Sequence, residues 1–215
     1  MEALLGKKIG MTQVFDEKGK VTPVTVLRVG PCYVLKVIQQ EKNNYYALQV
    51  GFEERKAKGL TRAELKFFEK IGVKPLRYIR ELRVKPEEIN NYKVRDSLSI
   101  EIFKETNYVD VQGNSLGKGF QGGMKRWGWK GGPQSHGSMS HRRSGSIGSS
   151  TNPGRVLKGR HMPGRMGNQK VTVKNLRIIS MDKEKNLLLV KGAVPGAENN
   201  LLVVKKSRKQ PEVKK

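Results

Sequence analysis

The sequence predicts a mainly β fold: a β-barrel body with one or two short helices and a long irregular basic extension inserted in it. Three observations support this class. Short apolar runs rich in β-branched residues recur in both end regions of the chain, separated by polar turns. Only one segment carries a clear helix signature. The 71 residues between Asp110 and Asp182 contain 13 Lys or Arg and no acidic residue.

Four apolar runs in the first half are expected to be strands: residues 11–15, 21–29, 32–38 and 45–52. Residues 16–19 separate the first two runs with a polar turn composition that ends in glycine. Residues 41–44 form a second polar turn before the fourth run. These short strands, each followed by turn residues, are typical of a barrel or sandwich.

Residues 61–72 are predicted to form a helix. Thr61 and Glu64 fit a capping box, in which each side chain accepts a hydrogen bond from the other residue's backbone amide. Leu65 and Phe68 then share one face, and Gly72 ends the helix. Six further strand-like runs follow: residues 78–84, 99–103, 108–112, 171–181, 187–190 and 201–204.

Residues 1–112 and 171–215 together are expected to form the barrel body, with residues 113–170 as the extension. The extension has 15 glycines, and only five of its 58 residues are Leu, Ile, Val or Phe. Burying so few large apolar groups, at about 1.5–3 kcal/mol each, does not offset a backbone entropy cost of roughly 1–2 kcal/mol per residue. We therefore expect the extension to become ordered against a partner.

The whole chain is basic, with 43 Lys or Arg against 19 Asp or Glu in 215 residues and a net charge of +24. The cations of the acid-free stretch repel one another, so their counter-charge is expected on another molecule, and closely spaced phosphates of a nucleic acid fit best. No signal peptide or membrane-spanning run is visible, which predicts a cytoplasmic protein with no membrane partner. The single cysteine, Cys32, lies in an apolar run and is expected to be a small core residue.

Two phosphate-binding patterns can be rejected in the extension. Residues 117–122 match G-x-G-x-x-G, but a dinucleotide site needs a following helix and an acidic residue about 20 positions on. Residues 123–129 are a poor helix-forming sequence, and the next acidic residue is Asp182. Residues 113–118 resemble a phosphate loop with the wrong spacing. The sequence therefore predicts no nucleotide cofactor and no small-molecule substrate.

The sharpest local feature of the extension is the run 125–130, which contains both tryptophans of the chain. Aromatic and guanidinium planes stack on unpaired bases, and cations offset phosphate charge, so Trp127 and Trp129 are candidates for RNA contact. The alternative is that both rings cover a small hydrophobic cluster. The role of Trp129 is left open.

The three histidines, His136, His141 and His161, lie in the extension without cysteine or carboxylate partners. Zinc binding and general acid–base catalysis both call for such partners, so we expect no metal, no catalytic residue and polar contacts to RNA instead. The predicted RNA-binding residues are Lys118, Lys125, Arg126, Trp127, Trp129, Lys130, His136, His141, Arg142, Arg143, Arg155, Lys158, Arg160, His161 and Arg165. The cations between residues 142 and 165 would form no single stripe on a helix, which favours an extended ribbon between RNA helices over a helix in a DNA groove.

Eight ordered motifs are distributed along the chain: residues 6–13 (GKKIGMTQ), 117–122 (GKGFQG), 125–127 (KRW), 135–137 (SHG), 140–142 (SHR), 145–148 (GSIG), 163–167 (PGRMG) and 186–196 (NLLLVKGAVPG). In this order they resemble the ribosomal protein L3 family of the large ribosomal subunit, in its bacterial form. The resemblance covers essentially the whole chain.

The resemblance implies a non-enzymatic, structural protein with a β-barrel on the subunit exterior and an extension into ribosomal RNA. Body and extension would bind 23S-type rRNA, notably its 3′-terminal domain, early in assembly. The loop with Trp127 would approach the peptidyl transferase region, and neighbouring large-subunit proteins would pack on the body. The glutamine that is methylated in some bacterial relatives after the 145–148 motif is absent here.

Two other functions are weighed against this one. An enzyme acting on RNA would need a catalytic group beside the basic surface, and turnover on rRNA fragments would reveal it. A non-specific DNA-compacting protein would bind duplex DNA and the rRNA domain with comparable affinity.

Overall fold

The computed structural model describes residues 2–39 and 45–208, so the expected turn at residues 41–44 lies outside the described residues. The chain separates into two compact units. The body unit comprises Met1–Asn114 and Lys170–Lys215, and the extension unit comprises Ser115–Gln169.

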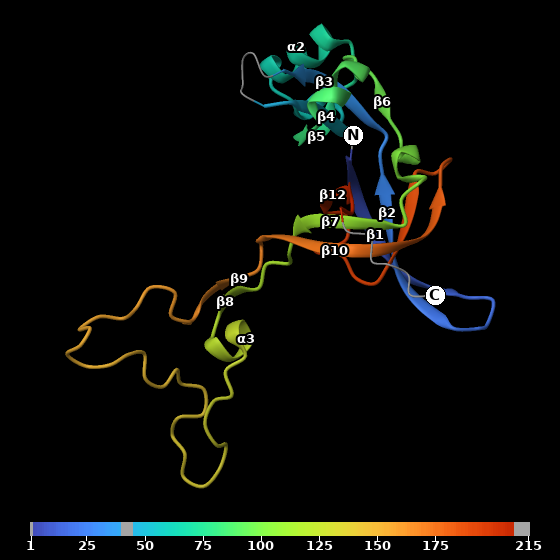
Figure 1. Cartoon of the computed structure of the whole chain (residues 1–215). Coiled ribbons are helices and arrows are strands. Elements are labelled where there is room, and N and C mark those ends of the chain that lie inside the picture. The colour runs from blue at the N-terminus through green and yellow to red at the C-terminus, as the bar shows by residue number, and fades with distance from the viewer. Residues whose placement is uncertain (1, 40–44, 209–215) are drawn as a thin grey trace. The chain divides into compact units, whose positions relative to one another are not determined.

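The body unit contains a closed antiparallel barrel in the order β1–β12–β7–β10–β11–β2 (Figure 1). Its strands are β1 (Ala3–Phe15), β2 (Val21–Val29), β7 (Tyr108–Asn114), β10 (Lys170–Asp182), β11 (Leu187–Lys191) and β12 (Leu201–Lys206). The strands after the extension unit interleave with those before it, since β12 lies between β1 and β7. The predicted mainly β class with a barrel body is confirmed.

A second antiparallel sheet, β5–β4–β3–β6, belongs to the same unit. Its strands are β3 (Cys32–Ile38), β4 (Ala47–Glu54), β5 (Leu76–Arg83) and β6 (Ser97–Leu98). One hydrophobic core joins the barrel to this sheet, because Leu4 and Val111 of the barrel belong to the same buried cluster as Val50 and Phe52 of β4. Burial of this continuous core is the main stabilising contribution to the body unit.

Helix α2 (Arg62–Ile71) begins and ends where the sequence predicts. The amide of Glu64 donates to the Thr61 hydroxyl at 3.4 Å, and the amide of Thr61 donates to the Glu64 carboxylate at 2.9 Å, which completes the capping box. Gly72 has φ +75°, a left-handed conformation that favours glycine. The helix buries Phe68 in a small cluster with Leu35 and Leu76.

Two predictions from the sequence need correction. Residues 99–103 are not a strand: the 3-10 helix η3 (Ile100–Phe103) follows β6, because Ile100 and Phe103, three positions apart, are both buried. Strand β1 begins at Ala3 rather than at residue 11. Gly6 and Gly10 weaken the β pattern in the sequence, yet Gly6 is needed because a Cβ there would lie 2.9 Å from the Arg28 carbonyl oxygen. The described residues of the body unit also form two short 3-10 helices, η1 (Ala57–Gly59) and η2 (Pro86–Asn91).

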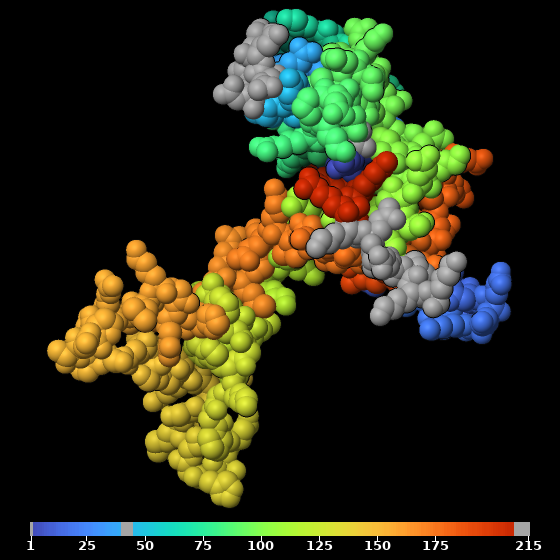
Figure 2. All heavy atoms as spheres, viewed as in Figure 1, coloured from blue at the N-terminus to red at the C-terminus, as the bar shows by residue number. Residues whose placement is uncertain are grey.

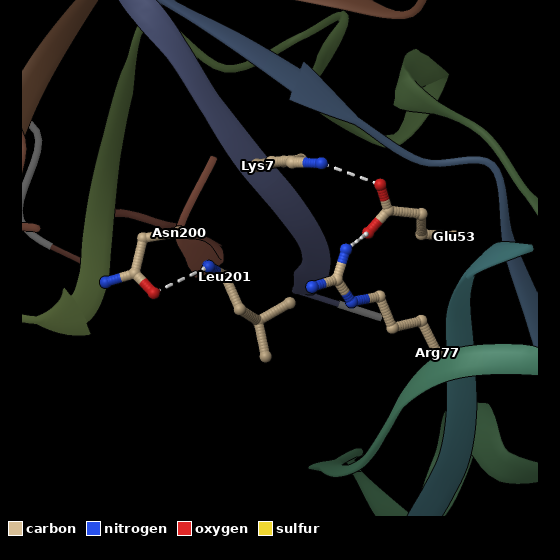
Figure 3. A network of polar contacts seen from close by, with 5 residues as sticks. All are labelled: Lys7, Glu53, Arg77, Asn200 and Leu201. Carbon is tan, nitrogen blue, oxygen red and sulfur yellow. Dashed lines mark hydrogen bonds and ion pairs between the residues drawn. The ribbon is translucent and has the colours of Figure 1, made fainter. Parts of the chain in front are cut away.

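A polar network connects the barrel to the second sheet (Figure 3). Lys7 Nζ of β1 lies 2.7 Å from Glu53 Oε1 of β4, and Arg77 Nη1 of β5 lies 3.5 Å from Glu53 Oε2. The Lys7 and Glu53 side chains are only 19% and 24% exposed, so solvent screens their attraction less than it screens a surface pair. These ion pairs therefore connect the barrel to the second sheet in addition to the shared apolar core.

Cys32 is confirmed as a core residue, since it is fully buried. Burial raises the pKa of its thiol to about 12, against a smaller lowering effect of a backbone hydrogen bond at Leu5. Because only the thiolate reacts, we predict that native protein at pH 8 is alkylated at least ~100-fold more slowly than protein unfolded in denaturant, where the pKa returns to about 8.5. Equal alkylation rates, measured by mass spectrometry with iodoacetamide, would contradict this buried position.

Candidate nucleic-acid interface

The extension unit is held at its base by a short hairpin. Strand β8 (Gly119–Gln121) pairs antiparallel with β9 (Gly164–Met166), and the amide of Ser115 donates to the Gln169 carbonyl at 2.8 Å. Residues 128–163 have no regular helix or strand. Figure 2 shows the unit, coloured from yellow-green to orange, as narrow lobes rather than as a rounded body. Most of its side chains are therefore accessible.

A short helix, α3 (Gly123–Trp127), lies where the sequence predicted none. Gly128 ends it at φ +73°, and its amide donates to the carbonyls of Gly123 and Met124. Gly123 also permits close packing, because a Cβ there would overlap the Trp129 ring. Local propensity is thus overridden by a left-handed cap and by tertiary packing. The helix gives no dinucleotide site, since the acid-free sequence still lacks the required carboxylate.

Trp129 is half-buried, and its ring packs against Gly123. The same residue lines an open hollow of about 320 Å³ together with Ser144, Ser146, Arg160 and His161. The ring therefore supports the loop on one side and borders a polar, basic hollow on another.

Trp127 contacts the later part of the loop, at residues 161–162. Its ring stacks on His161 with 3.9 Å between centroids and 4° between planes, and its Nε1 donates to the Met162 carbonyl at 2.8 Å. The Arg126 guanidinium carbon lies 4.9 Å from the ring centroid. The indole is 41% exposed, so part of it stays accessible although His161 occupies one face. Trp127 has a structural role in the loop whatever else it contacts.

Backbone carbonyl oxygens, rather than carboxylates, hold the polar side chains of the extension unit. Arg126 Nη1 donates to the Met162 carbonyl at 2.7 Å, and Arg160 Nη2 donates to the Ser146 carbonyl at 2.8 Å. His141 Nδ1 lies 2.8 Å from the Pro133 carbonyl, which can only accept, so this nitrogen carries the proton. These bonds orient the side chains without neutralising any charge.

The extension unit contains ten Lys or Arg and no Asp or Glu. Of the predicted site residues, the structure brings Arg126 and Trp127 together with His161, and it places Trp129 and Arg160 beside the same histidine. The others are exposed along the loop: Lys118, Lys125, Lys130, His136, His141, Arg142, Arg143, Arg155, Lys158 and Arg165. Two of them, Arg142 and Arg143, line a second open hollow together with Trp129. The unit is thus a distributed cationic surface rather than a single pocket.

Within residues 2–39 and 45–208, no group of three His, Cys, Asp or Glu residues is placed to hold a metal ion. In the same part of the chain, no helix is long and apolar enough to cross a membrane.

Three contributors to the site were not predicted as such. The Met162 carbonyl accepts from both Arg126 and Trp127, and no side-chain pattern signals a backbone acceptor. Gly164 leaves room for the Arg126 side chain to reach the Met162 carbonyl, because a Cβ at position 164 would lie 2.5 Å from Arg126 Nη1. The motif PGRMG, which contains Gly164, was the available signal. Gly123 was hidden among the other glycines of the extension.

A cation-rich, acid-free surface on an irregular loop is typical of nucleic-acid-binding proteins. Comparison with known proteins identifies the family of this chain. A family model described as Ribosomal protein L3 matches residues 85–187. The chain is 48% identical over 208 residues to large ribosomal subunit protein uL3 of Geobacter metallireducens, covering 97% of this chain and 98% of that relative.

Two further relatives agree. Large ribosomal subunit protein uL3 of Fervidobacterium nodosum is 43% identical over 210 residues, covering 98% of this chain and all of the relative. The protein of the same name from Heliobacterium modesticaldum is 48% identical over 208 residues, covering 97% and 98%. The chain belongs to the ribosomal protein L3 family. It is a structural ribosomal protein and not an enzyme.

Replacing Trp127 with alanine should loosen the loop without destabilising the body unit. The melting temperature followed by far-UV circular dichroism should change by less than about 2 °C, since 1 kcal/mol shifts it by roughly 2–4 °C in a chain of this size. Native cleavage by trypsin after Lys158 and Arg160 should rise several-fold, because the His161 stack and the Met162 contact are lost.

Phe120→Ala is the matched control, since that ring is 77% exposed in the same unit. It should leave both the melting temperature and the cleavage rate unchanged. Equal cleavage rates for the two variants would show that the contacts of Trp127 do not order the loop. A fall of many degrees in the melting temperature of Trp127→Ala would show that the ring stabilises the body unit.

Proposed function

We propose that the extension unit binds large-subunit rRNA and that the protein contributes to the ribosome by neutralising and ordering that RNA. One observation carries the proposal: ten exposed or half-exposed cations occupy a unit with no carboxylate. Lys and Arg that approach phosphates release condensed counterions, which supplies much of the binding free energy. The unit has no carboxylate that would compete with RNA phosphates for these cations.

The proposed contacts are of two kinds. The distributed cations approach phosphates along the loop. The hollow beside Trp129, Arg160 and His161 offers aromatic edges, a guanidinium and serine hydroxyls at one place, which suits a nucleotide with its phosphate. Glycines with positive φ and open space beside them, such as Gly137 and Gly145, let backbone amides approach RNA closely.

Family membership supports the finer parts of the proposal. The RNA is 23S-type rRNA, notably its 3′-terminal domain, bound early in assembly in the bacterial cytoplasm. The loop that carries Trp127 extends toward the peptidyl transferase region. Residues 1–112 and 171–215 act as the body that anchors residues 113–170, and neighbouring large-subunit proteins pack on that body.

The salt dependence of binding tests this mechanism. Each phosphate contact adds about 0.7–0.9 to the slope of log affinity against log salt. Replacing Arg142 and Arg143 with glutamine should therefore lower the slope by about 1.5, measured by filter binding to an rRNA 3′-domain fragment. The matched control is Lys66→Gln with Lys70→Gln, which removes two exposed cations from α2 and should leave the slope unchanged.

A slope near zero for the unmodified protein would contradict the mechanism. Competition with duplex DNA of equal length separates rRNA recognition from DNA compaction. We expect the rRNA fragment to bind at least ~10-fold more tightly, about 1.4 kcal/mol. Comparable affinities would contradict the assignment to rRNA.

A further inference from the structure

The distal half of the β1–β2 hairpin extends beyond the paired wall of the barrel (Figure 1, in blue). Strand β12 pairs with β1 only from Ala3 to Lys7, and β11 pairs with β2 only from Val24 to Arg28. In the described part of the chain, residues 11–15 have β2 as their one strand partner. A two-stranded ribbon of this kind is only marginally stable in water by itself.

One face of this distal hairpin is mostly apolar, with Gln13 as a polar residue between Met11 and Phe15. Cross-strand register pairs Gln13 with Pro23 and Phe15 with Val21, and strand alternation adds Met11 to the same face. Phe15, Met11 and Val21 are 61%, 52% and 49% exposed, and Pro23 is also exposed. Large apolar side chains gathered on one exposed face mark an interaction surface, whereas isolated ones need no explanation.

The charge of the hairpin indicates the kind of partner. Residues 9–25 contain Asp16, Glu17, Lys18 and Lys20, whose charges sum to zero, and the apolar face itself has no charged residue. A surface for rRNA phosphates would need cations, as in the extension unit. A second copy of this chain is also disfavoured, because two molecules of charge +24 repel each other.

Resting on the proposed packing of neighbouring large-subunit proteins on the body, we propose that the face formed by Met11, Phe15, Val21 and Pro23 docks onto an apolar surface of one such protein. Met and aromatic side chains are enriched at the centres of such interfaces, and burying Phe15 and Met11 removes the most exposed apolar area of the hairpin from water. The surface is separate from the proposed rRNA-binding residues, none of which lies in the hairpin.

Site-specific photocrosslinking in assembled large subunits tests the proposal. The full-length chain carries p-benzoylphenylalanine at Phe15 in one variant and at Thr12 in another. Thr12 is exposed on the opposite face of the same strand, which makes it the matched control. We expect irradiation to link the Phe15 variant to one defined protein of the subunit, with a yield at least several-fold above that of the Thr12 variant.

Linkage of the Phe15 variant to rRNA or to a second copy of the chain would overturn the proposal, as would equal yields from both positions. A second measurement uses Met11→Asp with Phe15→Asp. This variant should retain the melting temperature and rRNA affinity of the unmodified protein but lose the cross-linked neighbour from isolated subunits. Full retention of that neighbour would also count against the proposal.

Discussion

The extension unit depends on the pairing of β7 with β10 in the barrel wall. Asn114 faces Lys170 and Gly113 faces Val171, so both ends of the inserted segment are fixed one strand spacing apart. Gly113 is required there, because a Cβ would lie 2.5 Å from a Leu202 methyl group. The entropic cost of closing a loop grows slowly with its length, and the barrel core provides the stability that offsets it. The extension can therefore do without a large apolar core.

The two units differ in charge as well as in their contribution to stability. The body unit contains all the acidic residues of the chain and the ion pairs of the described residues, including the Lys7–Glu53–Arg77 network. In the extension unit, Arg126 and Arg160 bond to the carbonyls of Met162 and Ser146. A carbonyl satisfies a guanidinium hydrogen bond but leaves its charge in place. The loop is thus ordered locally while its cations stay available to an external polyanion.

Sequence patterns predicted most of the body strands and α2, because period-two alternation and capping residues act locally. They failed where tertiary contacts decide the outcome. Helix α3 forms around glycines because Trp129 packs on Gly123. The same limit applies to Trp127: its basic neighbours were visible in the sequence, but its stack on His161, 34 positions away, was not. The cationic, acid-free character of the extension could be predicted from the sequence, because it follows from the amino-acid composition alone.

The most direct test of the account replaces residues 115–169 with a two-residue Asn-Gly turn between Asn114 and Lys170. Because the barrel supplies the stability and the extension supplies the charge, the shortened protein should melt within about 5 °C of the full chain, a difference of roughly 1–2 kcal/mol. Its affinity for the rRNA 3′-domain fragment, measured in parallel, should fall at least ~100-fold, or about 2.7 kcal/mol. A folded barrel that binds the fragment as tightly as the full chain would contradict the central claim.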